Sequence, residues 1–208
     1  MLFSISSLHH DANAKNIFKP KTGKELAKYL ESDELRDRVD GLSVSLDDVS
    51  NSIVWNLNEV DPDLYCLAIN NYYEAANRSL ITKIMTSQVV YERVSDPRFK
   101  STPCAVVKQA KYVDGEPLIC QFSWFCSDKP KIIKLKNQDG TINKPKLNVW
   151  IDCIKAAIIA RRGLVENLTG YSTHFYIPSL VKPAWSSHEN YRTEVEFDGI
   201  AYVKWLNT

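Results

Sequence analysis

Glu74 is the side chain whose type and position best suit acid–base chemistry. The preceding residues predict a helix, because Asp61 can cap its free amides and Pro62 fits its first position. Apolar residues recur along this stretch at helical spacing, and Glu74 lies beside them, where the helix passes from core to surface. Such a border position partly removes a carboxyl group from water and raises its pKa, as a general acid near neutral pH requires.

Composition limits the classes of function. The 208 residues, with 26 Lys and Arg against 25 Asp and Glu, suit one ordinary domain with a sizeable core. A nucleic-acid partner is not expected, since such binding needs a basic surplus. No stretch approaches the roughly 18 apolar residues of a membrane span. The first ten residues lack the charged region and apolar run of a signal peptide, so we expect a protein made in the cytosol.

The cysteines and histidines do not predict a metal site. The five cysteines are an odd number without CxxC spacing, which favours reduced, buried thiols over a disulfide framework or a zinc site. The four histidines show no ligand spacing such as HxxxH or HExxH. We therefore expect no metal and no cofactor.

The elements that must position Glu74 fall into two regions. Residues 1–60 read as a partly helical N-terminal extension, with a polar, mobile lead over His9–Lys21 and a helix over Thr22–Arg38 capped by Thr22. Three later side chains are expected to dock on the main body: Val54, Trp55 and Leu57. A packed extension is favoured here, and a separate binding or regulatory module is the alternative. Residues 61–208 form the main domain.

The main domain is predicted to be α+β and mostly helical, with a small antiparallel sheet. Further helices are expected over Ser79–Val94, Thr102–Val107 and Lys146–Gly163, with caps or apolar spacing in each case. Residues 111–148 read as irregular. Alternating residues on either side of Asp198-Gly199 predict a terminal hairpin with a type I′ turn.

Several sequence blocks carry a family resemblance. The blocks are CLAINNYYEA at 66–75, SQVVYERV at 87–94, DPRF at 96–99, CQFSWFC at 120–126, LTGYSTHFY at 168–176 and VKPAW at 181–185. In this order they resemble the SleB-type cell wall hydrolase family, which includes spore-cortex-lytic enzymes. The resemblance extends from Asp61 to Trp205 and implies a fold like that of the lysozyme superfamily.

By this resemblance, the substrate is the glycan strand of peptidoglycan and Glu74 is the general acid. Glu74 would protonate the bond between N-acetylmuramic acid and N-acetylglucosamine. In a lytic transglycosylase it would then act as a base toward the muramic C6 hydroxyl and give a 1,6-anhydro product without water. A muramidase would instead use water. The resemblance also suggests a monomeric phage endolysin that waits in the host cytoplasm until it is released to the wall.

Six side chains within the matched blocks are candidates for substrate binding: Tyr73, Gln121, Ser123, Trp124, Thr173 and His174. The two aromatic rings can stack on pyranose faces, and the Gln and Ser side chains can hydrogen-bond sugar groups. The Thr-His pair can orient the muramyl group or the acid. The alternatives are a core position for Trp124 and a structural role for His174.

The chain departs from the family pattern at two places. The family reads E-A-R-G-E where this chain reads Glu74-Ala-Ala-Asn-Arg78, so a basic residue replaces the second acid. Glu92 stands where the family commonly has Asn; it would either approach Glu74 or pair with Arg78 or Arg93. Two other functions remain open. One is an amidase that cuts the bond between muramic acid and the L-alanine of the stem peptide, and the other is an inactive wall-binding protein.

Overall fold

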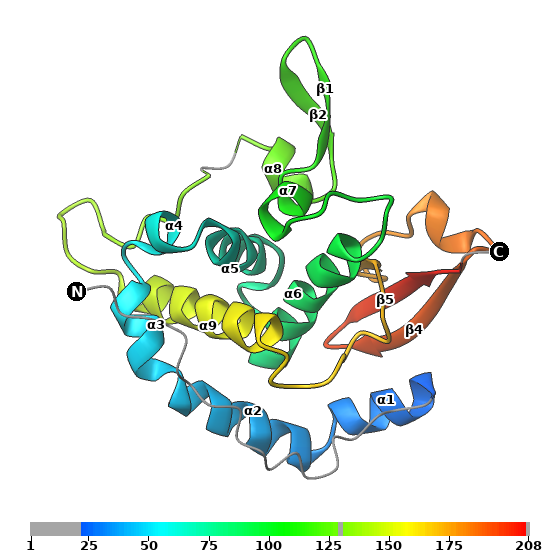
Figure 1. Ribbon diagram of the computed structural model, residues 1–208, viewed down its shortest axis with the longest axis horizontal. Helices are drawn as coiled ribbons and strands as arrows, with labels where there is room; N and C mark the ends of the chain where they lie inside the picture. Colours follow the sequence, from blue (N-terminus) through cyan, green and yellow to red (C-terminus); the bar gives the residue numbers. More distant parts are fainter. Residues whose placement is uncertain (1–21, 129–130, 207–208) are drawn as a thin grey trace.

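Three helices form the centre of the fold in the computed structural model, which describes residues 22–128 and 131–206 (Figure 1). They are α5 (Pro62–Ala75), α6 (Leu80–Val94) and α9 (Lys144–Arg161). The caps predicted for the first two are confirmed, since Asp61 accepts from the Leu64 amide and Ser79 from the Thr82 amide. Buried Asn71 joins all three helices through Ser87 Oγ and the Cys153 carbonyl. None of the helices in these described ranges is both long enough and apolar enough to cross a membrane.

A small antiparallel sheet packs beside the helices. It contains β3 (His174–Tyr176), β4 (Tyr191–Phe197) and β5 (Ile200–Trp205) in the order β3-β5-β4. Asp198 and Gly199 form the β4–β5 turn with positive φ angles of 50° and 73°, as the predicted hairpin requires. A short 3₁₀ helix, Ala184–Ser187, precedes β4. The α+β, mostly helical class is therefore confirmed.

Four N-terminal helices pack against the outside of this body: α1 (Gly23–Leu30), α2 (Asp33–Ser45), α3 (Asp47–Ile53) and α4 (Leu57–Val60). The single helix predicted from Thr22 is wrong, because Ser32 caps a second helix by accepting from the Leu35 amide. Arg38 donates to Glu166 Oε2 at 2.7 Å and to a backbone carbonyl at 2.6 Å. Buried apolar residues of these N-terminal helices also belong to the same hydrophobic core as those of the body. The predicted lead over His9–Lys21 lies outside the described residues.

The segment predicted to be irregular contains a hairpin, so that prediction is wrong in part. Strands β1 (Ala110–Val113) and β2 (Glu116–Cys120) pair around Asp114 and Gly115, both with positive φ. The hairpin projects from the body between α7 (Pro103–Val107) and α8 (Ser123–Cys126) (Figure 1). The short helix α7 begins and ends as predicted.

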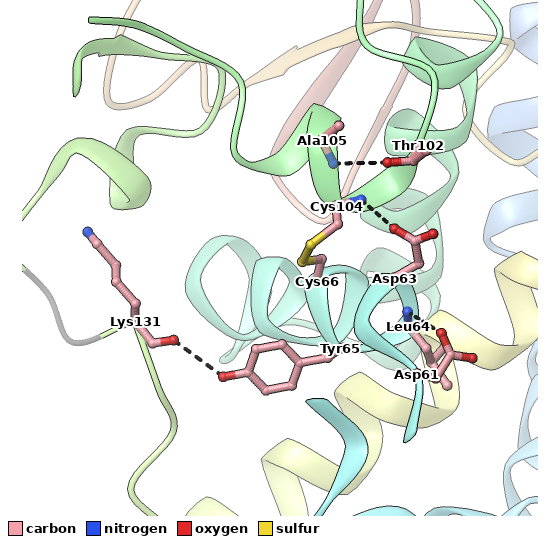
Figure 2. The surroundings of a disulfide bond; sticks show 9 residues. All are labelled: Asp61, Asp63, Leu64, Tyr65, Cys66, Thr102, Cys104, Ala105 and Lys131. Carbon is pink, nitrogen blue, oxygen red and sulfur yellow. Dashed lines mark hydrogen bonds between the residues drawn. A yellow bond between two sulfur atoms is a disulfide. The ribbon is translucent and has the colours of Figure 1, made fainter. Parts of the chain in front are cut away.

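Four of the five cysteines form disulfides, which corrects the prediction of reduced thiols. Cys66 on α5 bonds Cys104 on α7 across 38 residues, and Cys120 bonds Cys126. Figure 2 shows why the first pair meets: Asp63 Oδ1 accepts from the Cys104 amide at 2.9 Å and holds α7 against α5. Packing of α7 against α5 brings Cys66 and Cys104 together, and motif spacing does not report such a contact.

Candidate active site

Glu74 lies in the last turn of α5 and is half-buried, as its helical position predicts. A charge of opposite sign is carried by Arg93 of α6, and the two side chains attract each other electrostatically. Arg93 is 5% exposed. A buried cation therefore faces the candidate acid from the neighbouring helix.

Arg93 joins three segments that are far apart in the sequence. Its Nε donates to the Thr173 carbonyl at 2.7 Å. Its guanidinium carbon lies 4.7 Å from the centre of the Phe122 ring and 5.2 Å from that of Phe99, within range of cation–π attraction. Burial lowers the pKa of Arg93 to about 10, while Glu74 opposes this shift. Residues from four of the resembling blocks thus meet at one buried guanidinium.

His174 lies beside this cluster in its neutral form. Its Nδ1 is 2.9 Å from Thr173 Oγ1. Burial lowers the pKa of His174 to about 4; the charges of Arg93 and Arg98 act in the same direction, and Asp96 opposes them. The imidazole is therefore uncharged near neutral pH, so it can orient a neighbour through a hydrogen bond but adds no charge to the cluster.

Lowering the pH is expected to destabilise the fold in part through His174. Its proton binds near pH 6.5 in the unfolded chain but only near 4 in the folded one, so the unfolded state holds more protons between these values. The contribution of neutral His174 to the free energy of unfolding is fully present above pH 6.5 and is lost as the pH falls toward 4. It amounts to on the order of 3 kcal/mol in all. Urea unfolding across this window should show a weaker pH dependence for His174→Gln than for the unmodified chain.

Exposed His188 supplies the matched control for that measurement. His188→Gln should keep the pH dependence that His174 contributes, because it leaves the buried imidazole in place. An unchanged pH dependence in His174→Gln would contradict the burial of this imidazole.

Trp124 is part of the core. The residue is 4% exposed, its ring stacks on Tyr73 with 4.7 Å between ring centres, and its Nε1 donates to Asn70 Oδ1 at 2.9 Å. These contacts occupy its faces and its donor, which favours the core alternative over stacking on a sugar. Tyr73 is half-buried, and its predicted substrate contact stays a prediction.

Gln121 and Ser123 lie on the surface on either side of buried Phe122. The backbone amide of Gln121 donates to the backbone carbonyl of Gln109 at 3.0 Å, which holds this turn against the start of β1. The arrangement leaves both polar side chains exposed near the ring that contacts Arg93. Their predicted hydrogen bonds to sugar groups stay predictions.

Two cavities lie along α5, and Glu74 lines neither of them. The larger has a volume of about 490 Å³ and includes Tyr65 in its wall. The smaller has a volume of about 180 Å³ and includes Tyr72 and Tyr73. Because Tyr72 and Tyr73 belong to the last turn of α5, the smaller cavity lies at the end of the helix that carries Glu74.

The two departures from the family pattern have structural partners. Arg78 donates to the Asp198 carbonyl at 2.7 Å and so anchors the β4–β5 turn to α6. Glu92 accepts from Asn167 at 2.8 Å. Burial raises the pKa of Glu92, while Lys204 and the Asn167 hydrogen bond oppose the shift. Neither residue is thereby assigned to chemistry at Glu74.

Arg93 is the residue that the sequence analysis missed as part of the site. A usable signal was present: Arg93 follows buried Thr86 and Val89 at intervals of seven and four residues, so it falls on the inner face of α6. A charged residue at a buried helical position requires a partner or a function.

Among the described residues, no three His, Cys, Asp or Glu side chains gather into a group that could hold a metal ion.

Comparison with known proteins gives one match. A family model described as Cell Wall Hydrolase matches residues 77–197, more than half of the chain, and begins just after Glu74. No curated protein and no solved structure matched. The matched segment contains Arg93, Phe122, Thr173 and His174. The chain therefore belongs to the cell wall hydrolase family.

Proposed function

We propose that this protein cleaves the glycan strand of peptidoglycan between N-acetylmuramic acid and N-acetylglucosamine, with Glu74 as general acid and base. The observation that carries the proposal is the electrostatic pairing of half-buried Glu74 with buried Arg93, whose guanidinium also contacts the Phe122 ring and the Thr173 carbonyl. Membership of the family supplies the substrate, peptidoglycan.

A single carboxyl group can perform both steps of a lytic transglycosylase reaction. Glu74 first gives its proton to the glycosidic oxygen, and the bond from that oxygen to C1 of the muramic acid breaks. The resulting carboxylate then takes the proton of the muramic C6 hydroxyl, whose oxygen attacks C1 and closes the 1,6-anhydro ring. Partial burial favours the neutral acid of the first step, and the charge of Arg93 favours the carboxylate of the second.

The place of action is part of the same proposal. Disulfides persist in oxidising surroundings outside the cytosol, and the chain has two of them. Action at the wall after release from the cytoplasm fits this chemistry. The endolysin role inferred from the sequence stays a prediction.

Mass spectrometry of digested peptidoglycan tests the bond and the reaction type. We expect fragments that end in 1,6-anhydromuramic acid. Fragments with reducing muramic ends would replace the transglycosylase with a muramidase, in which water is the nucleophile. Free stem peptides with intact glycan would contradict the proposal and identify an amidase.

A further inference from the structure

A cavity of about 490 Å³ lies between the N-terminal helices and the body. Its N-terminal wall is made by residues that precede the family-matched segment: Val54, Trp55, Leu57 and Asn58. Of the three residues predicted to dock on the main body, Val54 and Leu57 are buried, whereas Trp55 is 56% exposed and lines the cavity. The volume of this cavity lies within the range typical of ligand sites.

The opposite wall comes from the segment between α8 and α9. Tyr65 of α5 donates to the Lys131 carbonyl at 3.3 Å and fixes the start of this segment (Figure 2). Further along the chain, the backbone amide of Asn143 donates to the backbone carbonyl of Leu135 at 2.9 Å. The wall is therefore a hydrogen-bonded structure rather than a loose loop.

The lining combines apolar surface with positive charge. Lys134 and Lys136 contribute the charge, and no Asp or Glu occurs in the described lining. The aliphatic members are Val54, Leu57, Ile132, Ile133 and Leu135. The smaller cavity shares Ile132, Ile133 and Lys134 and adds Lys146 beside Tyr73. The two cavities thus share part of a wall and form a basic, largely apolar path along α5, from Trp55 to Tyr73.

We propose that this path binds the acidic stem peptide that N-acetylmuramic acid carries. The inference rests on the proposed function, since a stem enters from Tyr73 only if its sugar lies at Glu74. Alanine methyl groups suit the aliphatic wall, and stem carboxylates suit the lysine ammonium groups. A sugar ring would need many hydrogen-bonding partners, and the described wall of the larger cavity offers few uncharged ones: Asn58, the Trp55 indole N–H and the Tyr65 hydroxyl, which already donates to Lys131.

The distances permit this arrangement. Tyr65 and Glu74 lie nine residues apart on α5, which corresponds to about 14 Å along a helix. An extended peptide of five residues spans about 17 Å. A stem attached near Glu74 therefore reaches the larger cavity.

Titration calorimetry with the free tripeptide L-alanyl-D-isoglutamyl-diaminopimelic acid tests the site directly. We expect binding to the unmodified chain and a loss of affinity of about tenfold or more in Lys134→Gln/Lys136→Gln, because charge-assisted hydrogen bonds are removed. The control variant Lys24→Gln/Lys28→Gln removes the same charge from exposed positions on α1 and should keep the affinity within about twofold. Equal affinity in the two double variants, or no binding by the unmodified chain, would overturn the inference. Tighter binding of a glycerol phosphate oligomer would overturn the peptide assignment.

Cleavage assays separate this inference from the proposed function. The substrates are glycan strands with stems and the same strands after enzymatic removal of the stems. We expect the unmodified chain to prefer strands with stems, and Lys134→Gln/Lys136→Gln to lose that preference while cleaving bare strands at the same rate. Cleavage without lysine-dependent preference overturns the inference alone. Lysine-dependent tripeptide binding without any glycan cleavage overturns the proposed function and leaves the peptide site in place.

Discussion

Glu74→Gln is expected to lower the rate of peptidoglycan cleavage by about 10³-fold, as the loss of a general acid–base group does in other enzymes. Glutamine keeps the shape of the side chain but can neither give up an acidic proton nor take one from a hydroxyl group. The variant should fold, because Glu74 is only half-buried at a helix end. Release of soluble muropeptides measures the rate, and thermal unfolding measures the stability.

Glu92→Gln is the matched control. Glu92 is also a partly buried helical carboxyl group, but it is bonded to Asn167 and lies in the field of Lys204. Its replacement should leave the cleavage rate within about twofold, since its hydrogen bond goes to Asn167 and a group that does not touch the reacting atoms contributes little to the transition state. Retained cleavage in Glu74→Gln would remove Glu74 from the mechanism, whatever the control shows.

The parts of the fold that the sequence predicts are those with local causes. Asp61 and Ser79 cap the two helices as expected, because each supplies the oxygen for an amide three residues later. Asp198-Gly199 makes the terminal hairpin, since both residues tolerate positive φ. Each of these outcomes depends on a few neighbouring residues and needs no knowledge of the tertiary structure.

The hairpin at Asp114-Gly115 was missed although it has the same local signal as the terminal one. Val113 and Glu116 flank a two-residue Asp-Gly turn, which is strong evidence for a hairpin. Pro117 and the exposed side chains of both strands obscured it, because strands without a buried face show weak alternation. The turn residues should have outweighed the missing alternation.

The candidate site is only partly visible in the sequence. Helical spacing places Glu74 at the edge of the core, but it gives no contact between α5, α6 and β3. The Asn70 and Asn71 side chains, on the same helix as Glu74, are fully buried. They bond Trp124 and Ser87, and such partners come from distant segments. Tertiary packing therefore decides which polar residues of α5 face substrate.

Arg93→Met is expected to reduce kcat by about 10²-fold, because a misplaced acid loses its alignment with the reacting bond. Methionine fills a similar volume without the charge that attracts Glu74. The KM should change little if Arg93 acts on Glu74 rather than on substrate. Loss of the hydrogen bond to Thr173 and of the ring contacts with Phe99 and Phe122 should cost about 3 kcal/mol of stability.

The pKa of His174 separates an electrostatic role of Arg93 from a purely structural one. Because the charge of Arg93 lowers this pKa, Arg93→Met should raise it toward its usual range, as NMR of the imidazole can measure. Arg98→Met should also raise it but should leave kcat within about twofold, since Arg98 pairs with Asp96 and stands over Trp205. Arg93→Lys should keep the low pKa and recover part of the lost rate, because it restores the charge without the planar group. A folded Arg93→Met variant with unchanged kcat would show that Glu74 is oriented without this guanidinium.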